Sequence, residues 1–451
     1  MTRSPFAPLL LTITLVGCSA ESPPATADTM APEAPARVDA TCRSEVQIPG
    51  PMHSVLERSP DPHANTFGAL PEPRRVHLGW PGADTSRSIA FTWVTEVEPG
   101  EDVGTLASLV ELQGPDDPEP VLHEGASYLL VHPDDAVNDP NLDGAPAYPG
   151  SRVHELRLCG ALTPSTTYTY RVGGGDHWSP TYTFTTPPEP GSDVPITVAV
   201  LGDSRGSYEE WGQILAAANE HDPDVFLFTG DMVEYGTQQW EWDAWFDATG
   251  SILAEKVIVP SHGNHEFLAA NYFAMFAMPH NGSWFHVDVG PLRAASLNDS
   301  FTTAQQMEVE QVDYMDDIFT DDAPPWRFAF HHRATFSANN RHGSAENLRR
   351  HWQPAFERGG VQLVFAGHNH IYERSKPILG SAEAEDGVTY IVSGGAGAPL
   401  YRSFNEDAWF LETAATEQHY LIGQIQGGAS SWEVRSPSGS VLDAFEVNLD
   451  R

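Results

Sequence analysis

The chain has 451 residues, of which 40% are hydrophobic, so it is long enough to form two domains with sizeable cores. It contains 24 Lys and Arg against 62 Asp and Glu, which gives a formal net charge of −38. A protein this acidic repels nucleic acids and anionic membrane surfaces, so we expect no nucleic-acid partner.

The N-terminal segment has the pattern of an export signal. A basic start at Arg3 precedes a nearly apolar run from Ala7 to Val16, which is shorter than the roughly 20 residues that span a bilayer. The run ends in "LVGC", which resembles a bacterial lipoprotein signal and predicts a signal peptide over residues 1–18 with lipid on Cys18. An ordinary secretory signal with a chance cysteine remains the alternative. We therefore expect an exported protein of the cell envelope, in the periplasm or on the cell surface, that touches the membrane only through a lipid anchor.

Residues 19–45 are rich in Pro, Ala and Glu, a composition that predicts a disordered tether. Export also permits a disulfide between the two other cysteines, Cys42 and Cys159. The sequence leaves open whether these two residues meet.

Residues 70–187 read as an all-β domain. The segments "RSIAFTWVTEV", "HELRLCG" and "TTYTYRV" are typical of half-buried strands, and turn-rich pieces separate them, as in a small sandwich. The stretch "TTPPEPGSDVP", residues 185–195, predicts a linker to the next domain.

In residues 195–447, strand-like segments alternate with helical ones. The strand-like "ITVAVLGDSRG", the helical "YEEWGQILAAANEH" and the strand-like "DVFLFTGDMVEYG" follow one another, which predicts a layered α/β domain. Later, "KVIVPSHGNHE", "RFAFHHR" and "VQLVFAGHNH" repeat an apolar strand that ends in polar residues. Residues 344–360 predict one helix, with Ser344 as its N-cap.

The polar residues after these five strands are the types that bind metal ions. Because ligands of α/β sheets bind at the carboxyl ends of the strands, we expect these side chains to meet at one edge. Carboxylate, imidazole and amide oxygen together suit first-row transition ions, and a shared carboxylate can hold two ions about 3.5–4 Å apart. Such a pair of ions would also reverse the local field that otherwise repels a phosphate group from this acidic chain.

In order, the motifs are Gly202-Asp203, Gly230-Asp231, Gly263-Asn264-His265-Glu266, His332 and Gly367-His368-Asn369-His370. This set resembles the calcineurin-like metallophosphoesterase superfamily, and within it the purple acid phosphatases. The resemblance covers residues 70–447. It implies a layered α/β/β/α sandwich preceded by a fibronectin-III-like β-sandwich.

By position in these motifs, the resemblance implies two metal ions (Fe, Zn or Mn) and six ligands: Asp203 and His370 on the first ion, Asp231 between the two, and Asn264, His332 and His368 on the second. It implies that His265 acts near the leaving-group oxygen as general acid. It places His342 against the substrate, although a plain surface histidine is the alternative reading. We expect His262 and His331 to support or pack against the site.

Two positions depart from the family pattern. Arg205 stands where the superfamily often has a histidine ligand, and it stays protonated, so it cannot bind a metal. It would either hold a phosphate oxygen or form a salt bridge to a carboxylate. Glu234 stands where purple enzymes have a tyrosine ligand, and Tyr235 is one residue further. The remaining ligand of the first ion is thus Glu234, Tyr235 or water.

The predicted activity is hydrolysis of phosphomonoesters, with hydroxide from metal-bound water attacking phosphorus directly. Two alternatives stay open. The same metal core would serve a phosphodiesterase acting on nucleotides or phospholipid head groups. The other hypothesis is a surface binding protein whose metal site is inactive. Arg205 and the missing tyrosine favour it.

Overall fold

The computed structural model of the protein describes residues 55–58, 70–96, 107–131, 151–300 and 303–449, which belong to one compact unit. The predicted signal peptide with Cys18 and the predicted tether with Cys42 lie outside the described residues. Cys159 is disulfide-bonded. Among the described residues, the helices are too short or too polar to cross a bilayer.

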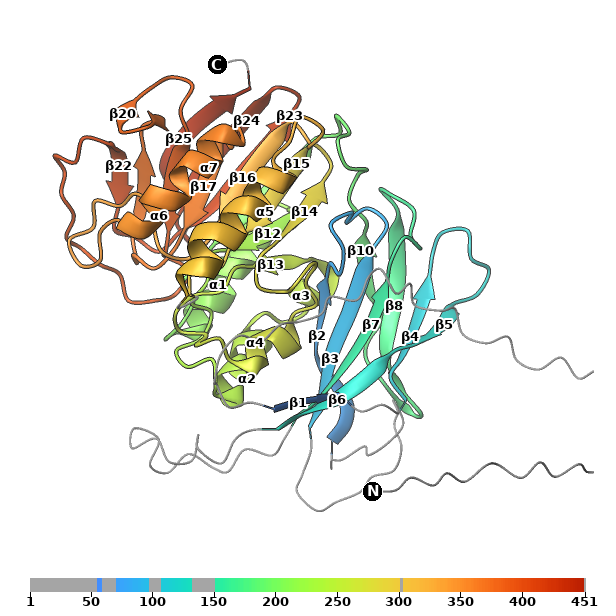
Figure 1. The fold of residues 1–451 in the computed structure, drawn as a ribbon. Coiled ribbons are helices and arrows are strands. Elements are labelled where there is room, and N and C mark those ends of the chain that lie inside the picture. Colours follow the sequence, from blue (N-terminus) through green and yellow to red (C-terminus); the bar gives the residue numbers. More distant parts are fainter. Residues whose placement is uncertain (1–54, 59–69, 97–106, 132–150, 301–302, 450–451) are drawn as a thin grey trace, which may run out of the picture. The chain divides into compact units, whose positions relative to one another are not determined.

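The first domain is a sandwich of two antiparallel sheets (Figure 1, blue to teal). One sheet has the strand order β1-β6-β7-β3-β2, and the other has the order β10-β8-β4-β5 with β9 beside β8. Phe91 of β3 contacts Tyr170 of β8 across the two sheets, with ring centroids 4.6 Å apart. The strands are Val55–Arg58 (β1), Leu70–Gly79 (β2), Ile89–Glu96 (β3), Leu109–Gln113 (β4), Val121–Glu124 (β5), Ala126–Val131 (β6), Ser151–Leu158 (β7), Thr167–Gly174 (β8), His177–Trp178 (β9) and Tyr182–Thr185 (β10).

The second domain contains a six-stranded and a seven-stranded sheet. The six-stranded sheet has the order β13-β12-β11-β23-β24-β25, in which β11, β12 and β13 are parallel. Its strands are Ile196–Leu201 (β11), Val225–Phe228 (β12), Ile258–Pro260 (β13), Tyr420–Gln426 (β23), Ala429–Arg435 (β24) and Val441–Asn448 (β25).

The seven-stranded sheet has the order β14-β15-β16-β17-β21-β18-β22, and its four strands from β15 to β21 run parallel. Its strands are Phe285–Val289 (β14), Leu292–Ser296 (β15), Trp326–Phe330 (β16), Leu363–Ala366 (β17), Tyr372–Ser375 (β18), Thr389–Ser393 (β21) and Leu411–Ala415 (β22). A two-stranded ribbon, Ile378–Leu379 (β19) and Ala382–Glu383 (β20), lies apart from it.

The two sheets pack face to face. Trp432 of β24 contacts Phe328 of β16 and Phe365 of β17, with ring centroids 5.7 and 5.2 Å apart. Alternate residues such as Ala329 and Val364 point to the opposite face of the seven-stranded sheet, where they join a second apolar cluster. This alternation buries both faces of the sheet, which explains why these strands are apolar almost throughout.

Helices cover the outer faces of both sheets. On the six-stranded sheet, Trp211 of α1 stacks on Trp245 of α2 at 5.1 Å and contacts Phe228 of β12 at 5.4 Å. The second cluster includes Met315 of α5 and Phe356 of α7, which cover the seven-stranded sheet (Figure 1). The α/β/β/α layering and the preceding β-sandwich are therefore confirmed. The helices are Tyr208–Asn219 (α1), Gln239–Ala248 (α2), Ile252–Glu255 (α3), Ala270–Met275 (α4), Gln305–Glu310 (η3, a π-helix), Gln311–Ile318 (α5), Glu346–His351 (α6) and Gln353–Arg358 (α7).

The helix expected over residues 344–360 is instead two short helices, α6 and α7, and the expected cap is wrong. Ala345 is the N-cap of α6. The Ser344 hydroxyl accepts a hydrogen bond from the Ser337 amide at 3.0 Å, so it serves the preceding loop rather than the helix.

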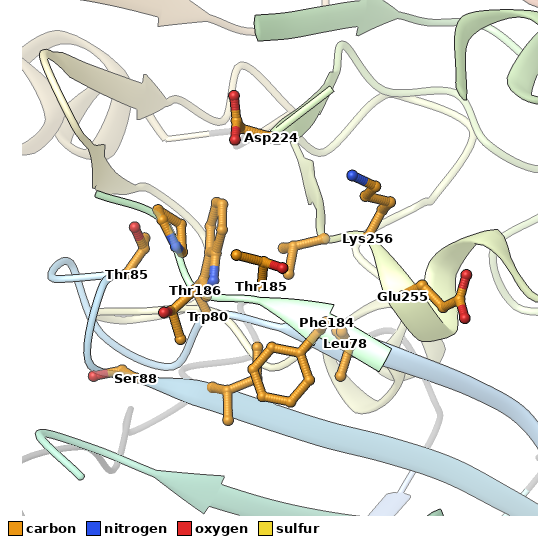
Figure 2. Close-up of a pocket in the computed structure, with 13 residues that line it drawn as sticks. Leu78, Trp80, Thr85, Ser88, Phe184, Thr185, Thr186, Asp224, Glu255 and Lys256 are labelled. Atoms are coloured by element: carbon orange, nitrogen blue, oxygen red, sulfur yellow. The ribbon is translucent and has the colours of Figure 1, made fainter. Parts of the chain in front are cut away.

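The sandwich and the second domain touch through polar and apolar contacts. The Tyr170 hydroxyl donates to the Ala254 carbonyl at 2.6 Å, and Arg75 pairs with Asp243 at 3.1 Å. A cavity of about 40 Å³ lies in this seam. It is lined by Trp80 and Phe184 from the sandwich and by Asp224 and Lys256 from the second domain (Figure 2). None of the six predicted metal ligands lines it.

Candidate metal centre

Six predicted ligands lie just beyond the carboxyl ends of parallel strands. The strands and the residues that follow them are β11 with Asp203, β12 with Asp231, β13 with Asn264, β16 with His332, and β17 with His368 and His370. The two sheets face each other, so these strand ends converge from both layers onto one place. This is the juxtaposition that the strand-and-loop pattern predicts.

The backbone is unusual at three of these six residues. Asp203, Asp231 and His368 have φ angles of 59°, 55° and 65°. Residues other than glycine rarely adopt this left-handed conformation, and such outliers cluster at functional sites. The conformation turns the chain sharply at the strand end and points each side chain toward the shared edge.

Glycines allow the loops to approach one another closely. A Cβ atom on Gly263 would collide with the amide nitrogen and carboxylate of Asp231, and one on Gly367 would collide with the Asp203 carboxylate. The glycines of the Gly263-Asn264 and Gly367-His368 motifs therefore have a steric cause, because a carboxylate occupies the space that a side chain would take.

Asp231, Asn264, His332 and His368 bring their ligand atoms together. His332 Nε2 lies 3.1 Å from Asp231 Oδ1 and 3.1 Å from Asn264 Oδ1. His368 Nδ1 lies 3.2 Å from His332 Nε2. Asp231 and His332 are almost completely buried, whereas Asn264 and His368 are half-buried, so this group opens to solvent on one side.

A second group forms around Asp203. His370 Nε2 lies 3.4 Å from Asp203 Oδ1, and both side chains are buried. Ligand atoms of Asp203, Asp231 and His370 lie within 4.8 Å of one another, as do those of Asp231, His332 and His368. Asp231 is common to both groups, which is the position of a carboxylate shared by two ions.

Backbone carbonyls set the orientation of two imidazole rings. His332 Nδ1 lies 2.9 Å from the Thr229 carbonyl, and His370 Nδ1 lies 2.8 Å from the Pro399 carbonyl. Each Nδ1–H therefore donates to a carbonyl, which leaves the Nε2 lone pair directed into the cluster. Histidine ligands are commonly oriented in this way.

The lone pairs that converge here require a positive charge between them. In that tautomer, His332 Nε2 is an acceptor that faces two further acceptors, Asp231 Oδ1 and Asn264 Oδ1. Without a metal ion, a proton on Nε2 supplies that charge: burial alone would lower the pKa of His332, but Asp231 and Asp203 raise it to about 10. Burial alone would raise the pKa of Asp231, but His332 holds it well below its usual range. The donor set therefore fits a metal cation, which would neutralise the same carboxylates.

A buried carboxylate, Glu266, holds two of the loops in place. Its oxygens accept hydrogen bonds from the backbone amides of Gly263 at 2.7 Å, Met232 at 2.7 Å and Asp231 at 3.1 Å. Burial raises the pKa of Glu266 to about 7, and the charge of Asp231 adds to this effect. Glu266 thus joins the loop after β12 to the loop after β13.

Asp299, which follows β15 of the seven-stranded sheet, likewise holds a loop of the site in place. Its carboxylate accepts from the His332 amide at 3.1 Å and from the Arg333 guanidinium at 2.8 Å. Burial would raise its pKa, but a hydrogen bond from His331 and the charge of Arg333 hold it below its usual range. Sequence reasoning missed Asp299, although it also follows an apolar strand.

Arg205 lies against the cluster rather than in solvent. Its Nη1 donates to Glu234 Oε2 at 2.5 Å, its Nε lies 3.5 Å from Asp231 Oδ2, and its Nη2 lies 3.4 Å from His370 Nε2. The expected salt bridge to a carboxylate is therefore present. Glu234 is paired with the guanidinium and lies outside the two groups that could hold a metal. Tyr235 stacks on Phe267 at 6.1 Å.

His265 lies beside the shared carboxylate. Its Nδ1 is 2.7 Å from the Glu234 carbonyl, so the Nδ1–H donates there, and its Nε2 lies 3.9 Å from Asp231 Oδ2. The ring is half-buried. Nε2 is thus the atom of His265 that is free to exchange a proton at the cluster.

His342 and Tyr401 form part of the rim. The His342 ring lies 4.3 Å from the His368 ring, and the Tyr401 ring stacks on His370 at 4.3 Å with an interplanar angle of 17°. The structure therefore brings exposed His342 next to the cluster. Sequence reasoning assigned no role to Tyr401, because nothing around "APLY" distinguishes it from any aromatic residue in a loop.

His262 and His331 lie outside the cluster. His262 Nε2 accepts the Leu268 amide at 3.0 Å, and its ring stacks on Phe273. His331 lies 3.5 Å from Asp299 and packs edge-on against Trp352. Both are buried and support loops of the site.

Comparison with known families defines the class of protein. The family model of the calcineurin-like phosphoesterases matches residues 196–372, and the model of the purple acid phosphatase N-terminal domain matches residues 73–186. The chain is thus a metallophosphoesterase, a hydrolase whose catalytic domain follows a β-sandwich.

Individual proteins that resemble this chain are purple acid phosphatases. Purple acid phosphatase 22 of Arabidopsis thaliana is 29% identical over 67% of this chain and 73% of its own length. Purple acid phosphatase 21 of the same plant is 31% identical over 55% of this chain and 59% of its own length. The solved structure of purple acid phosphatase PPD1 from yellow lupin (Lupinus luteus) seeds has the same fold, with a TM-score of 0.69 at 21% identity over 84% of this chain and 74% of that one. The chain therefore carries a calcineurin-like phosphoesterase domain behind a purple acid phosphatase N-terminal domain, and it resembles the purple acid phosphatases, a family with a dinuclear metal centre.

Proposed function

We propose that the protein hydrolyses phosphomonoesters at a dinuclear metal centre. One observation carries the proposal: six lone-pair donors from five strand ends converge, with Asp231 common to both groups. Asp203 and His370 would hold the first ion, and Asn264, His332 and His368 the second. The ions would supply a hydroxide nucleophile near neutral pH and neutralise charge on the phosphoryl oxygens.

His265 is the proposed general acid. Its Nδ1–H is held by the Glu234 carbonyl, so only Nε2 faces the cluster. A proton on Nε2 would pass to the leaving-group oxygen as the bond to phosphorus breaks. A fixed ring orientation keeps that proton aimed at one place.

Arg205 is the proposed phosphate clamp. Its guanidinium is already within reach of Asp231 and His370, and its planar fork suits two phosphoryl oxygens. The ion pair with Glu234 holds it in position before substrate arrives. With Glu234 so engaged and Tyr235 stacked on Phe267, water is our proposal for the remaining ligand of the first ion.

His342 is the proposed substrate contact on the rim. It is exposed, and its ring lies beside that of His368. Burial and the charge of Arg341 lower its pKa, which favours the neutral, hydrogen-bonding form of the imidazole.

We also propose that the protein is exported and lipid-anchored on Cys18, with Cys42 as the disulfide partner of Cys159. The disulfide on Cys159 supports export, because disulfides persist in oxidising compartments. Metabolic labelling with a fatty acid checks the anchor. A Cys18→Ser variant that still takes up the label would overturn it.

The test of function combines metal content with substrate preference. We would measure bound metal by elemental analysis and compare hydrolysis of a chromogenic phosphomonoester with that of the matching diester. Asp231→Asn removes the shared carboxylate, and Asp316→Asn, which alters an exposed ion pair with Arg358, is the matched control.

Two ions per chain, and monoester hydrolysis lost in Asp231→Asn but not in Asp316→Asn, is the expected result. Preference for the diester would favour a phosphodiesterase for nucleotides or phospholipid head groups. A protein that binds no metal and hydrolyses neither ester would favour the binding-protein reading.

A further inference from the structure

Arginines without a carboxylate partner are rare in the described part of this acidic chain. Most arginines there have a carboxylate partner, as Arg333 has Asp299 and Arg374 has Asp443. Among the described residues, three exposed arginines have none: Arg341, Arg350 and Arg402. In a chain with 62 acidic residues, a cation left without a carboxylate is available for a ligand.

Two of these arginines, Arg341 and Arg402, lie on loops that are joined by backbone hydrogen bonds. The Asn340 amide donates to the Ser403 carbonyl at 3.0 Å, and the Asn405 amide donates to the Ala338 carbonyl at 2.8 Å. Asn339 and Phe404 form an isolated antiparallel bridge. The pairing holds the loop that carries Arg341 against the loop that carries Arg402.

Arg341 is stacked in line with the metal centre. Its guanidinium carbon lies 4.5 Å above the Tyr401 ring, and the Tyr401 ring lies 4.3 Å from the ring of His370. Next to Arg341 in the chain, His342 lies 4.3 Å from the His368 ring. The guanidinium is therefore one aromatic ring beyond a proposed metal ligand, and the stack limits the positions it can take.

We propose that Arg341 is a specificity-determining residue that binds a second anionic group of the substrate, beside the phosphate that reacts. The inference rests on the proposed phosphomonoesterase function and names its substrate class: phosphomonoesters whose organic part carries a carboxylate or another phosphate. A guanidinium fork matches either group. Without it, the charge of the chain would repel such a substrate more than a neutral one.

The test uses pairs of ligands that differ by one charge. Binding is measured by calorimetry with para-phosphonobenzoate and phenylphosphonate, which cannot be hydrolysed. Hydrolysis is measured with para-carboxyphenyl phosphate and its methyl ester. Because each pair is compared as a ratio between variants, the acidity of the leaving group cancels.

The variants are Arg341→Gln and, as control, Arg350→Gln. Arg350 is an exposed arginine of α6 that also lacks a carboxylate partner among the described residues. The wild type should prefer the carboxylated member of each pair. Arg341→Gln should reduce that preference about fivefold, as expected for an exposed charge pair, and added salt should erase it. Arg350→Gln should keep it.

An unchanged preference in Arg341→Gln, no preference in the wild type, or equal losses in both variants would overturn the inference. The protein could hydrolyse neither ester and still show a binding preference that depends on Arg341. That result would support recognition by Arg341 and contradict the proposed phosphomonoesterase activity. Hydrolysis of both esters with a preference that is the same in the wild type and in Arg341→Gln would do the reverse.

Discussion

The guanidinium of Arg205 and the carboxylate of Glu234 form an ion pair at 2.5 Å beside the carboxylate of Asp231. The Arg205 side chain is 15% exposed and that of Glu234 is 35% exposed, so the pair lies at the edge of the cluster. It places a permanent positive charge 3.5 Å from the carboxylate shared by the two metal groups. Glu234 offsets that charge, and a bound phosphate would offset it further.

Substitution of Arg205 or Glu234 distinguishes two roles for Arg205: binding of phosphate, or a salt bridge that serves the structure alone. Arg205→Gln should weaken inhibition by inorganic phosphate about tenfold, because it removes a charge-assisted hydrogen bond of about 1.5–3 kcal/mol. Glu234→Gln should leave phosphate inhibition equal or stronger, since the guanidinium then lacks its competitor. The inhibition constants of both variants check this. Equal phosphate affinity in all three proteins would assign Arg205 to structure alone.

Gly263→Ala should abolish metal binding. The added Cβ would meet the amide nitrogen and carboxylate of Asp231, so the loop after β12 or β13 must shift. Gly428→Ala is the matched control, because a Cβ there meets nothing within 4 Å. We expect the loss of metal to be accompanied by about 2–4 kcal/mol of destabilisation, as for other overpacked cores. Elemental analysis and denaturant unfolding measure the two effects. Full metal content in Gly263→Ala would contradict the tight approach of the loops.

Glu266→Gln should weaken the site without touching a metal ion. All three protein partners of the Glu266 carboxylate described above are N–H donors, whereas one end of a glutamine amide is itself a donor. Leaving one buried N–H group unpaired costs about 1–3 kcal/mol. We expect metal affinity to fall about 10–100-fold, as for other groups that orient ligands. Competition with a chelator measures this affinity. A variant with lower stability but unchanged metal affinity would limit Glu266 to a packing role.

Glu373 should make stability depend on pH. It is 3% exposed, its carboxylate accepts the Ala338 amide at 2.9 Å, and burial raises its pKa to about 7 from an ordinary value of 4.5. Between these values the folded chain holds a proton that the unfolded chain has released. The contribution of this residue to the free energy of unfolding is therefore full below about pH 4.5 and falls as pH rises to about 7.

The loss is on the order of 3 kcal/mol for a shift of this size. Glu373→Gln should flatten this part of the profile, whereas Glu346→Gln, which alters an exposed residue, should not. Denaturant unfolding at about pH 5 and about pH 8 checks the slope. A wild-type slope that persists in Glu373→Gln would assign it to other groups.

The strand pattern predicted an α/β domain with metal-type residues at its strand ends, and the resemblance to the metallophosphoesterases implied the layering and the six ligands. Apolar runs such as "VFLF" and "LVFA" are buried on both faces, and glycine with a polar residue at their ends marks the turn. Parallel strands of one sheet end at a common edge. Asp231 and His368 follow strands of different sheets, and they approach one another because the two sheets pack face to face. The prediction of a single helix capped by Ser344 over residues 344–360 was wrong because it depended on a tertiary contact. The Ser344 hydroxyl bonds to Ser337 in the preceding loop instead.

The sequence by itself therefore determined the layers, the strand ends and the metal-type residues that follow them. Only the tertiary structure decided that Arg205 pairs with Glu234, that Tyr401 stacks on His370 and that Arg341 covers Tyr401. Hydrophobic periodicity records which residues are buried along one element. It carries no information about side chains brought together from different loops, whose partners depend on backbone pairings such as that between Asn340 and Ser403.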